Sequence, residues 1–319
     1  MQEEIRFATF NAFNLAPPGA HLYEGLAPCT REQYEAKLAW TAHQIDALDA
    51  DVIGFQEIFS QQSLSEVLAR TRHYRDAAHV GFDPDPRLEK LTPSVALVSR
   101  LPLAEEAFAQ PLFPAGVTLP DGHRDAGRFA RPVLQVAIQV APSLVVDVVV
   151  VHLKSQRPDF RLGDSVDDPH SYAVGCLRSL MRRGTEAVAL RVMLSELRRE
   201  TGRPSVVLGD FNDTSDAVTT SIVMGVGAQP QDRFYDAYEI RSGSHGVRGA
   251  GFSTIHEGRY ATIDHVLVSP EFNPMLPGAI GEVVDVAYLN DHLTLVREGA
   301  SDHGQVVARV RLFERPRHD

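Results

Sequence analysis

Short apolar runs rich in β-branched residues recur along the whole chain, and they constrain its fold more than any other feature. Each run is four to eight residues long, a length that suits a buried strand better than a helix. These runs predict strands at residues 5–10, 51–55, 94–99, 133–140, 144–151, 205–208, 262–268 and 305–312.

Segments with helical spacing lie between the runs and predict helices at residues 31–48, 60–70 and 172–200. Three stretches without periodicity, at residues 110–131, 155–171 and 273–300, predict long loops. Neither a Pro/Gly/Ser linker nor a repeat divides the chain. We therefore expect a single domain over residues 1–319.

The composition, 44% hydrophobic and 23% charged, predicts a globular protein with a sizeable core. The net charge of −11 disfavours tight nonspecific binding to nucleic acid or anionic membranes. Two cysteines, Cys29 and Cys176, are too few for a disulfide framework or a cysteine zinc site. Without a signal segment or an apolar run of about 20 residues, we expect a cytoplasmic protein with no membrane span. The oligomeric state is left open.

Polar groups lie at the ends of five predicted strands or in the turns beside them, and a sixth lies at the start of a strand. Position matters here as much as identity, because strand ends are where catalytic groups are commonly presented. The six motifs are Phe10-Asn11, Gln56-Glu57, His152-Leu153-Lys154, Gly209-Asp210-Phe211-Asn212, Ile263-Asp264-His265 and Ser301-Asp302-His303.

Each motif alone also has a purely structural interpretation. Asn11 suits a turn, and Glu57 suits the first turn of a following helix. His152 has the alternative of a hydrogen-bonded structural histidine, and Asp264 that of an ion pair with His265. The 209–212 and 301–304 segments have the alternative of polar turns.

Together the motifs supply the groups for phosphoryl transfer. Carboxylate and amide oxygens suit Mg²⁺ or Mn²⁺ rather than zinc, and Glu57 with help from Asn11 and Asp302 would form such a site. Histidines beside carboxylates supply proton transfer near neutral pH. A metal site combined with His/Asp pairs therefore favours hydrolysis of a phosphate ester.

In this order and context the six motifs resemble those of the endonuclease/exonuclease/phosphatase superfamily, whose fold is DNase I-like. The resemblance extends from Phe7 to Val307, and it is most specific at 209–212, at 301–303 and at the Gln56-Glu57 step. It implies an α/β (α+β) fold, a four-layer sandwich in which two mostly antiparallel sheets pack face to face with helices outside.

The resemblance also implies roles for individual residues. Glu57 is similar to the principal metal ligand, Asn11 to a residue that contacts or supports the metal shell, and Asp302 to a second acidic contact. Phe13 stands where some DNA-repair members have an aspartate, which argues against a second metal at that position.

The remaining motif residues match groups that act on water or phosphate. Asp210 resembles the carboxylate that orients or deprotonates the attacking water, and Asn212 resembles the group that holds the phosphate or that water. His303 is similar to the histidine that contacts the phosphate and assists proton transfer, with Asp264 orienting its imidazole. His152 resembles a histidine that stabilises charge on phosphoryl oxygens.

Substrate contacts are predicted from the loops. Lys154 and a basic run of three arginines, Arg124, Arg128 and Arg131, are candidates for binding phosphate, although a solvated charged loop explains the run equally well.

Three hypotheses for function follow. The first is a metal-dependent phosphodiesterase or phosphatase acting on a small or lipid-like ester, and the second is a nuclease cutting DNA or RNA. The third is an inactive binding scaffold, which the complete set of motif residues disfavours.

Overall fold

The β-branched runs assemble into two six-stranded sheets in the computed structural model, which describes residues 4–83, 91–119, 127–241, 251–295 and 297–314. Sheet A has the strand order β13-β14-β1-β2-β4-β3 and contains β1 (Glu4–Leu15), β2 (Val52–Ile58), β3 (Ala78–Gly81), β4 (Ser94–Ser99), β13 (Gly281–Leu289) and β14 (Gln305–Leu312). Sheet B has the order β5-β6-β7-β8-β12-β9 and contains β5 (Phe108–Leu112), β6 (Arg128–Ala141), β7 (Leu144–His152), β8 (Ser205–Asp210), β9 (Tyr235–Asp236) and β12 (Asp264–Val268).

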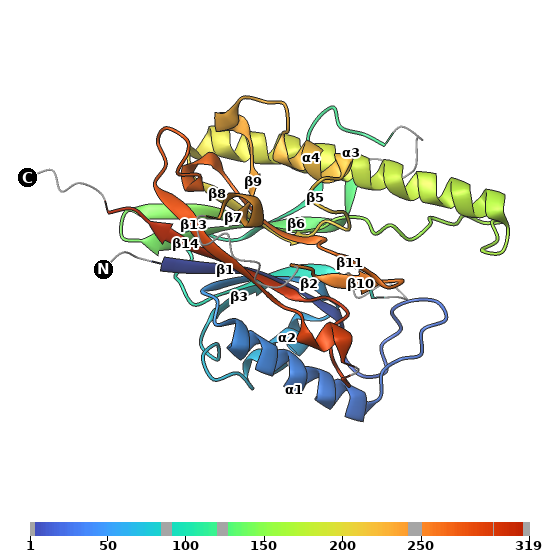
Figure 1. Cartoon of the computed structure of the whole chain (residues 1–319). Coiled ribbons are helices and arrows are strands. Elements are labelled where there is room, and N and C mark those ends of the chain that lie inside the picture. The colour runs from blue at the N-terminus through green and yellow to red at the C-terminus, as the bar shows by residue number, and fades with distance from the viewer. Residues whose placement is uncertain (1–3, 84–90, 120–126, 242–250, 296, 315–319) are drawn as a thin grey trace, which may run out of the picture.

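Helices cover the outer faces of both sheets (Figure 1). The helices are α1 (Arg31–Leu48), α2 (Gln61–Leu68), α3 (Pro169–Thr201), α4 (Val218–Met224) and α5 (Ala237–Ile240). The short elements are the hairpin β10 (Thr254–His256) and β11 (Arg259–Ala261), and three 3-10 turns, η1 (Pro230–Asp232), η2 (Pro270–Phe272) and η3 (Asp291–Thr294). Within the described ranges, every helix is too short or too polar to cross a bilayer.

Alternation along the strands builds three apolar layers. Val148 and Val150 of β7 belong to the core between the sheets, whereas Val149 and Val151 belong to the layer under α3. In β1, Phe7 faces the central core and Phe10 faces α1. Because successive strand residues point to opposite faces, one valine-rich strand contributes to two layers at once. The predicted four-layer sandwich is thus confirmed.

Each sheet has one parallel strand pair, and all its other pairs are antiparallel. Helix α1 connects the parallel pair β1 and β2, and α3 connects β7 and β8, because a parallel pair needs a long crossover. The carboxyl ends of a parallel pair lie side by side. His152 is therefore opposite Asp210. Asn11 is opposite Gln56 inside the β1–β2 pair, because β1 continues to Leu15 and β2 to Ile58 instead of ending at Phe10 and Phe55 as predicted.

All three predicted loops include some regular structure, and the longest prediction is wrong for much of its length. Residues 273–300 include the nine-residue strand β13 and the turn η3. A register shift between Val283 and Asp285 interrupts the alternation of β13, which removes the period-2 signal expected of a strand. Residues 110–131 include the end of β5 and the start of β6.

The predicted helices agree closely with the structure, because their capping residues can be recognised from the sequence. Thr30 and Gln33 form a capping box at the start of α1. Asp168 caps α3, which begins at Pro169 and so starts within the predicted loop at residues 155–171. Gly202, with a φ of 64°, ends α3 in the left-handed conformation that favours glycine.

Candidate active site

Three neighbouring strand ends of sheet B place His152, Asp210 and Asp264 side by side. His152 is the last residue of β7 and Asp210 is the last of β8. Strand β12 runs antiparallel to β8, so its first residue, Asp264, is paired with Asp210. Two carboxylates are thus brought together by strand register.

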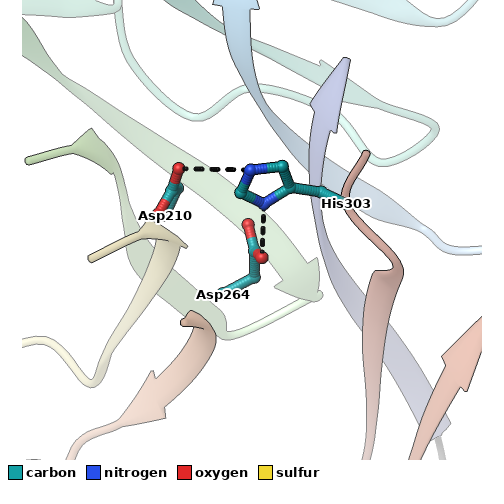
Figure 2. Close-up of side chains that lie close together, drawn as sticks. All are labelled: Asp210, Asp264 and His303. Carbon is teal, nitrogen blue, oxygen red and sulfur yellow. Dashed lines mark hydrogen bonds and ion pairs between the residues drawn. The ribbon is translucent and has the colours of Figure 1, made fainter. Parts of the chain in front are cut away.

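His303 reaches this cluster from the turn before β14, an inner strand of sheet A (Figure 2). Its Nδ1 lies 2.8 Å from Asp264 Oδ2, and its Nε2 lies 3.9 Å from Asp210 Oδ2. All three residues are buried, with Asp264 having no exposed surface at all. The group therefore joins the two sheets.

Burial and charge shift the ionisation of this group. Burial raises the pKa of Asp210 to about 7, and the charge of Asp264 acts in the same direction. Burial alone would lower the pKa of His303, but Asp264 and Asp210 raise it well above its usual value. The imidazole is therefore protonated at neutral pH, whereas Asp210 is poised to exchange a proton.

Asp210 is held by donors from both sheets. Asn11 Nδ2 donates to Asp210 Oδ2 at 3.1 Å, and the backbone N–H of Asn212 donates to Oδ1 at 2.8 Å. His152 Nε2 lies 3.4 Å from Oδ2. Burial, together with the charges of Arg131 and His303, lowers the pKa of His152 well below its usual value, so this imidazole is neutral.

Glu57 enters the same site from β2 through an unusual backbone conformation. Its φ is 59°, and those of Phe13 and Asn14 are 49° and 59°. Left-handed backbone at non-glycine residues costs on the order of 1–3 kcal/mol each and is concentrated at functional sites. The N–H of Asn14 donates to Glu57 Oε2 at 3.0 Å, which fixes the carboxylate.

A cleft of about 630 Å³ is lined by His152, Asp210, His303 and Glu57, whereas the buried Asp264 is not part of its wall. The site residues that were predicted from the sequence and line this cleft are Glu57, His152, Lys154, Asp210, Asn212, Asp302, His303 and Arg131. The charge of Glu57 raises the pKa of Asp210, which places the two carboxylates within electrostatic reach. Glu57, Asp210 and His303, far apart in the chain, thus meet at one cleft.

The other predicted site residues are arranged differently. Asn11 does not line the cleft; its Oδ1 accepts the N–H of Phe13, and its amide group holds Asp210. Arg128 begins β6 as an exposed residue that is not part of the cleft wall. Arg124 lies outside the described residues.

Lys154 lines the cleft, but its ammonium group has protein partners. It donates to the carbonyls of Ser155 and Arg157 and to the hydroxyl of Ser179. Burial, aided by the charge of Arg131, lowers its pKa to about 8. These contacts tie the loop after β7 to α3, and a contact of Lys154 with substrate stays a prediction.

The donor set fits a hard divalent cation. Asp210, Asp264 and His303 have ligand atoms within 4.8 Å of one another, but the Asp264–His303 hydrogen bond occupies atoms that a cation between them would need. Glu57 and Asp302 line the cleft with carboxylate oxygens outside that hydrogen bond, and such oxygens suit Mg²⁺ or Mn²⁺.

Sequence reasoning missed several residues of the cleft, among them Tyr23, Asn14 and Arg157. Tyr23 stacks edge-on against Phe59, with ring centroids 5.9 Å apart. Burial and the charge of Glu57 raise its pKa to about 12. Residues 16–30 have no periodicity, so no local signal could have placed Tyr23 near Glu57.

Several solved structures of known proteins have a similar architecture. A crystal structure of an endonuclease/exonuclease/phosphatase from Bacteroides vulgatus is similar with a TM-score of 0.60 at 16% identity, covering 97% of this chain and 99% of that chain. The human Nocturnin catalytic domain gives a TM-score of 0.61 at 15% identity, covering 98% and 96%. A mannosyl-6-phosphatase from Bacteroides thetaiotaomicron gives 0.56 at 16% identity, covering 96% and 99%.

At these identities the likeness shows a shared fold. A search of curated proteins gives no match. The model of the Endonuclease/Exonuclease/phosphatase family, in contrast, matches residues 8–303, which include every residue that lines the cleft. The chain therefore belongs to the endonuclease/exonuclease/phosphatase family, whose members are hydrolases of phosphate esters.

Proposed function

We propose that this phosphoesterase depends on Mg²⁺ or Mn²⁺ and hydrolyses a phosphodiester or phosphomonoester by in-line attack of water. The observation that supports this most directly is the buried Asp264–His303 pair, which lies beside Asp210 in the cleft that Glu57 also lines. Glu57 and Asp302 are the proposed ligands of the cation. When bound, the cation would neutralise charge on the phosphate and acidify water.

Asp210 is the proposed acceptor of the proton of the attacking water. Its raised pKa, about 7, gives it useful basicity near neutral pH. Asn11 and the backbone of Asn212 fix both of its oxygens, so the carboxylate cannot rotate away from the water. Preorganisation of this kind lowers the barrier without reorganisation during the reaction.

His303 is the proposed donor to the phosphoryl group. Asp264 holds Nδ1, which leaves Nε2–H to face the cleft and donate to a phosphoryl or leaving-group oxygen. Neutral His152 lies against Asp210 and would donate a hydrogen bond to the same phosphoryl oxygen as His303. Arg131 and Asn212 line the same cleft and would bind the remaining oxygens.

A small or lipid-like phosphate ester is the favoured substrate class, because the net charge of −11 repels a long polyanion. A nuclease activity is the second candidate. It is favoured by the cationic residues Arg131, Lys154 and Arg157, which line one cleft.

Metal-dependent assays test the proposal and separate the candidates. Mono-aryl and bis-aryl phosphates, plasmid and RNA would each be incubated with Mg²⁺ or Mn²⁺, with EDTA as the control. We expect hydrolysis of an aryl ester that EDTA abolishes. Cleavage of plasmid or RNA would favour the nuclease, and inactivity on every ester by folded protein would instead indicate a scaffold.

Substitutions at the cluster test the proposed roles. Asp210→Asn and His303→Ala should each lower kcat by about 10² or more, the usual scale for acid-base groups. Unchanged circular dichroism would establish that the fold survives, and His43→Ala, at an exposed position on α1, is the matched control. Full activity of Asp210→Asn at saturating metal would contradict the assignment of water activation.

A further inference from the structure

A second pocket of about 330 Å³ opens beside the catalytic cleft. It lies between the loop after β1, helix α1 and residues 298–300. Phe13, Asn14 and Leu26 line both cavities, so the two are adjacent. The pocket is therefore next to the cleft in which the phosphate of the ester would bind.

The wall between the cavities is built from strained backbone. Phe13 and Asn14 are consecutive non-glycine residues with positive φ, and a bulky aromatic residue rarely adopts this conformation. Asn14 also fixes Glu57 through its N–H. The same turn thus positions the proposed metal ligand and shapes the pocket, which is the kind of site where strain is retained.

The pocket is mostly apolar but has one buried cation. Leu22, Leu26 and Pro28 line it from the loop. Lys37 lines it from α1, with only 9% of the residue exposed. Lys37 Nζ lies 5.4 Å from the Phe13 ring centroid and 3.5 Å from the carbonyl oxygen of Ala300.

Within the part of the chain that the structure describes, the Lys37 ammonium group has one long hydrogen bond and aromatic contacts, so it is poorly satisfied. Burial lowers its pKa to about 8, while the charges of Asp302 and Glu57 oppose this. The amine thus has donor capacity left for an anion. Glu298 also lines the pocket, but it is exposed, so solvent screens its charge.

Residues 298–300 close the pocket tightly against α1. Gly299 has a φ of 75°, and a Cβ at this position would lie 2.7 Å from the backbone of Ala36 and Lys37. Only glycine permits this approach. The position of the closing segment is therefore specified by its sequence.

We propose that this pocket is the subsite for the alcohol portion of the phosphate ester, an apolar group that has its own negative charge and pairs with Lys37. The proposal rests on the phosphoesterase function proposed above. Substrate preference would then depend on the turn at Phe13 and on helix α1. Hydrolysis itself is carried out by other residues. A volume of this size is at the lower end of the range for small-molecule sites, about 300–1,000 Å³.

A series of 4-nitrophenyl phosphodiesters tests the subsite at pH 7 with saturating Mn²⁺. The second alcohol would be methyl, hexyl, 5-carboxypentyl or 5-phosphonopentyl, and nitrophenolate release gives kcat/KM. We expect the hexyl ester to exceed the methyl ester, and at least one charged ester to exceed the hexyl ester by about tenfold, the scale of a charge-assisted hydrogen bond. The preferred charged ester distinguishes a carboxylate substrate from a phosphate one.

Two variants separate the contributions of charge and shape. Lys37→Met should remove the preference for charged over hexyl esters. Ala27→Trp, at an exposed position on the rim, should fill the pocket and remove the preference for hexyl over methyl. Arg70→Met, which removes an exposed cation paired with Glu35 on α1, should keep both wild-type ratios.

Equal kcat/KM for all four esters would overturn the subsite while leaving the phosphoesterase proposal intact. Wild-type ratios in folded Lys37→Met and Ala27→Trp would overturn it as well. Absence of metal-dependent hydrolysis of any ester would instead reject the proposed function. Calorimetric titration with hexanoate gives a readout without turnover, and at least tenfold weaker binding to Lys37→Met is expected.

Discussion

His265 follows Asp264 directly in the chain, yet the two side chains belong to separate networks. Asp264 contacts His303, whereas His265 Nδ1 lies 2.7 Å from Asp236 Oδ2 and its Nε2 lies 3.0 Å from the carbonyl oxygen of Asp213. Neighbours in a strand point to opposite faces, so the ion pair suggested by sequence adjacency is wrong. His265 instead supports the turn that contains Asn212.

The His265–Asp236 pair predicts a pH dependence of stability. Burial alone would lower the pKa of His265, but the hydrogen bond and charge of Asp236 raise it overall. The contribution of the pair is therefore complete below the unfolded pKa, about 6.5, and is lost as pH rises through the folded value. The loss of Tm in His265→Gln should thus be largest below that pH and shrink at alkaline pH. An identical loss at every pH would contradict this, and His43→Gln is the exposed control.

A second prediction for a single residue concerns Glu57. Glu57→Gln keeps the size of the side chain and an acceptor for Asn14 but removes the charge that would bind the cation. The metal concentration for half-maximal activity should rise by tenfold or more, on the order of the loss of one charged ligand. Titration of activity against Mn²⁺ measures this. Glu200→Gln, at the exposed end of α3, should leave the titration unchanged.

Elements with strong local signals were predicted well, and those with irregular backbone were not. Helix α1 has its predicted bounds because its cap and apolar spacing are local properties. Strand β13 was missed because a register shift breaks its alternation. Asp210 and His152 proved to be the last residues of their strands rather than residues of the turns beyond, which makes their positions more rigid.

Gly209 shows how an element fixes a site residue. A Cβ at this position would overlap the carbonyl oxygen of Val151 on the adjacent strand. Gly209→Ala should therefore destabilise the protein by about 1–3 kcal/mol, the range for overpacking, and should lower kcat by displacing Asp210. Denaturant unfolding and kinetics measure the two effects. A Cβ at Gly184 in α3 meets nothing within 4 Å, so Gly184→Ala should be neutral or stabilising; equal behaviour of the two variants would contradict the packing argument.

At the scale of the whole molecule, two six-stranded sheets pack face to face, and residues from both line the cleft. Sheet A supplies Asn11, Glu57 and the turn with His303, and sheet B supplies Asp210 and Asp264. The central core contains residues of both sheets. We propose on this basis that the chain folds as one domain, because separation of the sheets would expose that core and divide the site.

A cation bound between the sheets should stabilise the whole molecule. Because binding to the folded state alone shifts the unfolding equilibrium, stability should increase by about 2.7 kcal/mol at a metal concentration of 100 Kd. Mn²⁺ should raise the Tm of the wild type and EDTA should reverse the effect, as followed by calorimetry. Asp210→Asn should retain a shift and Glu57→Gln should lose most of it. A Tm indifferent to metal in the wild type would argue against the proposed ligands.

The sequence by itself determined the long helices α1 and α3, the strands with unbroken alternation and the polar residues near their ends, because strand alternation, helix caps and apolar spacing are local. The family resemblance predicted that Asp264 orients His303, but only the tertiary structure established the contacts themselves. Asn11 and Asp210 are 199 residues apart, and Asp264 and His303 are 39 apart. Their contacts depend on how two sheets pack and on strand register, which no local propensity encodes. The pocket around Lys37 is of the same kind, since its walls come from three separate segments that meet only when the chain is folded.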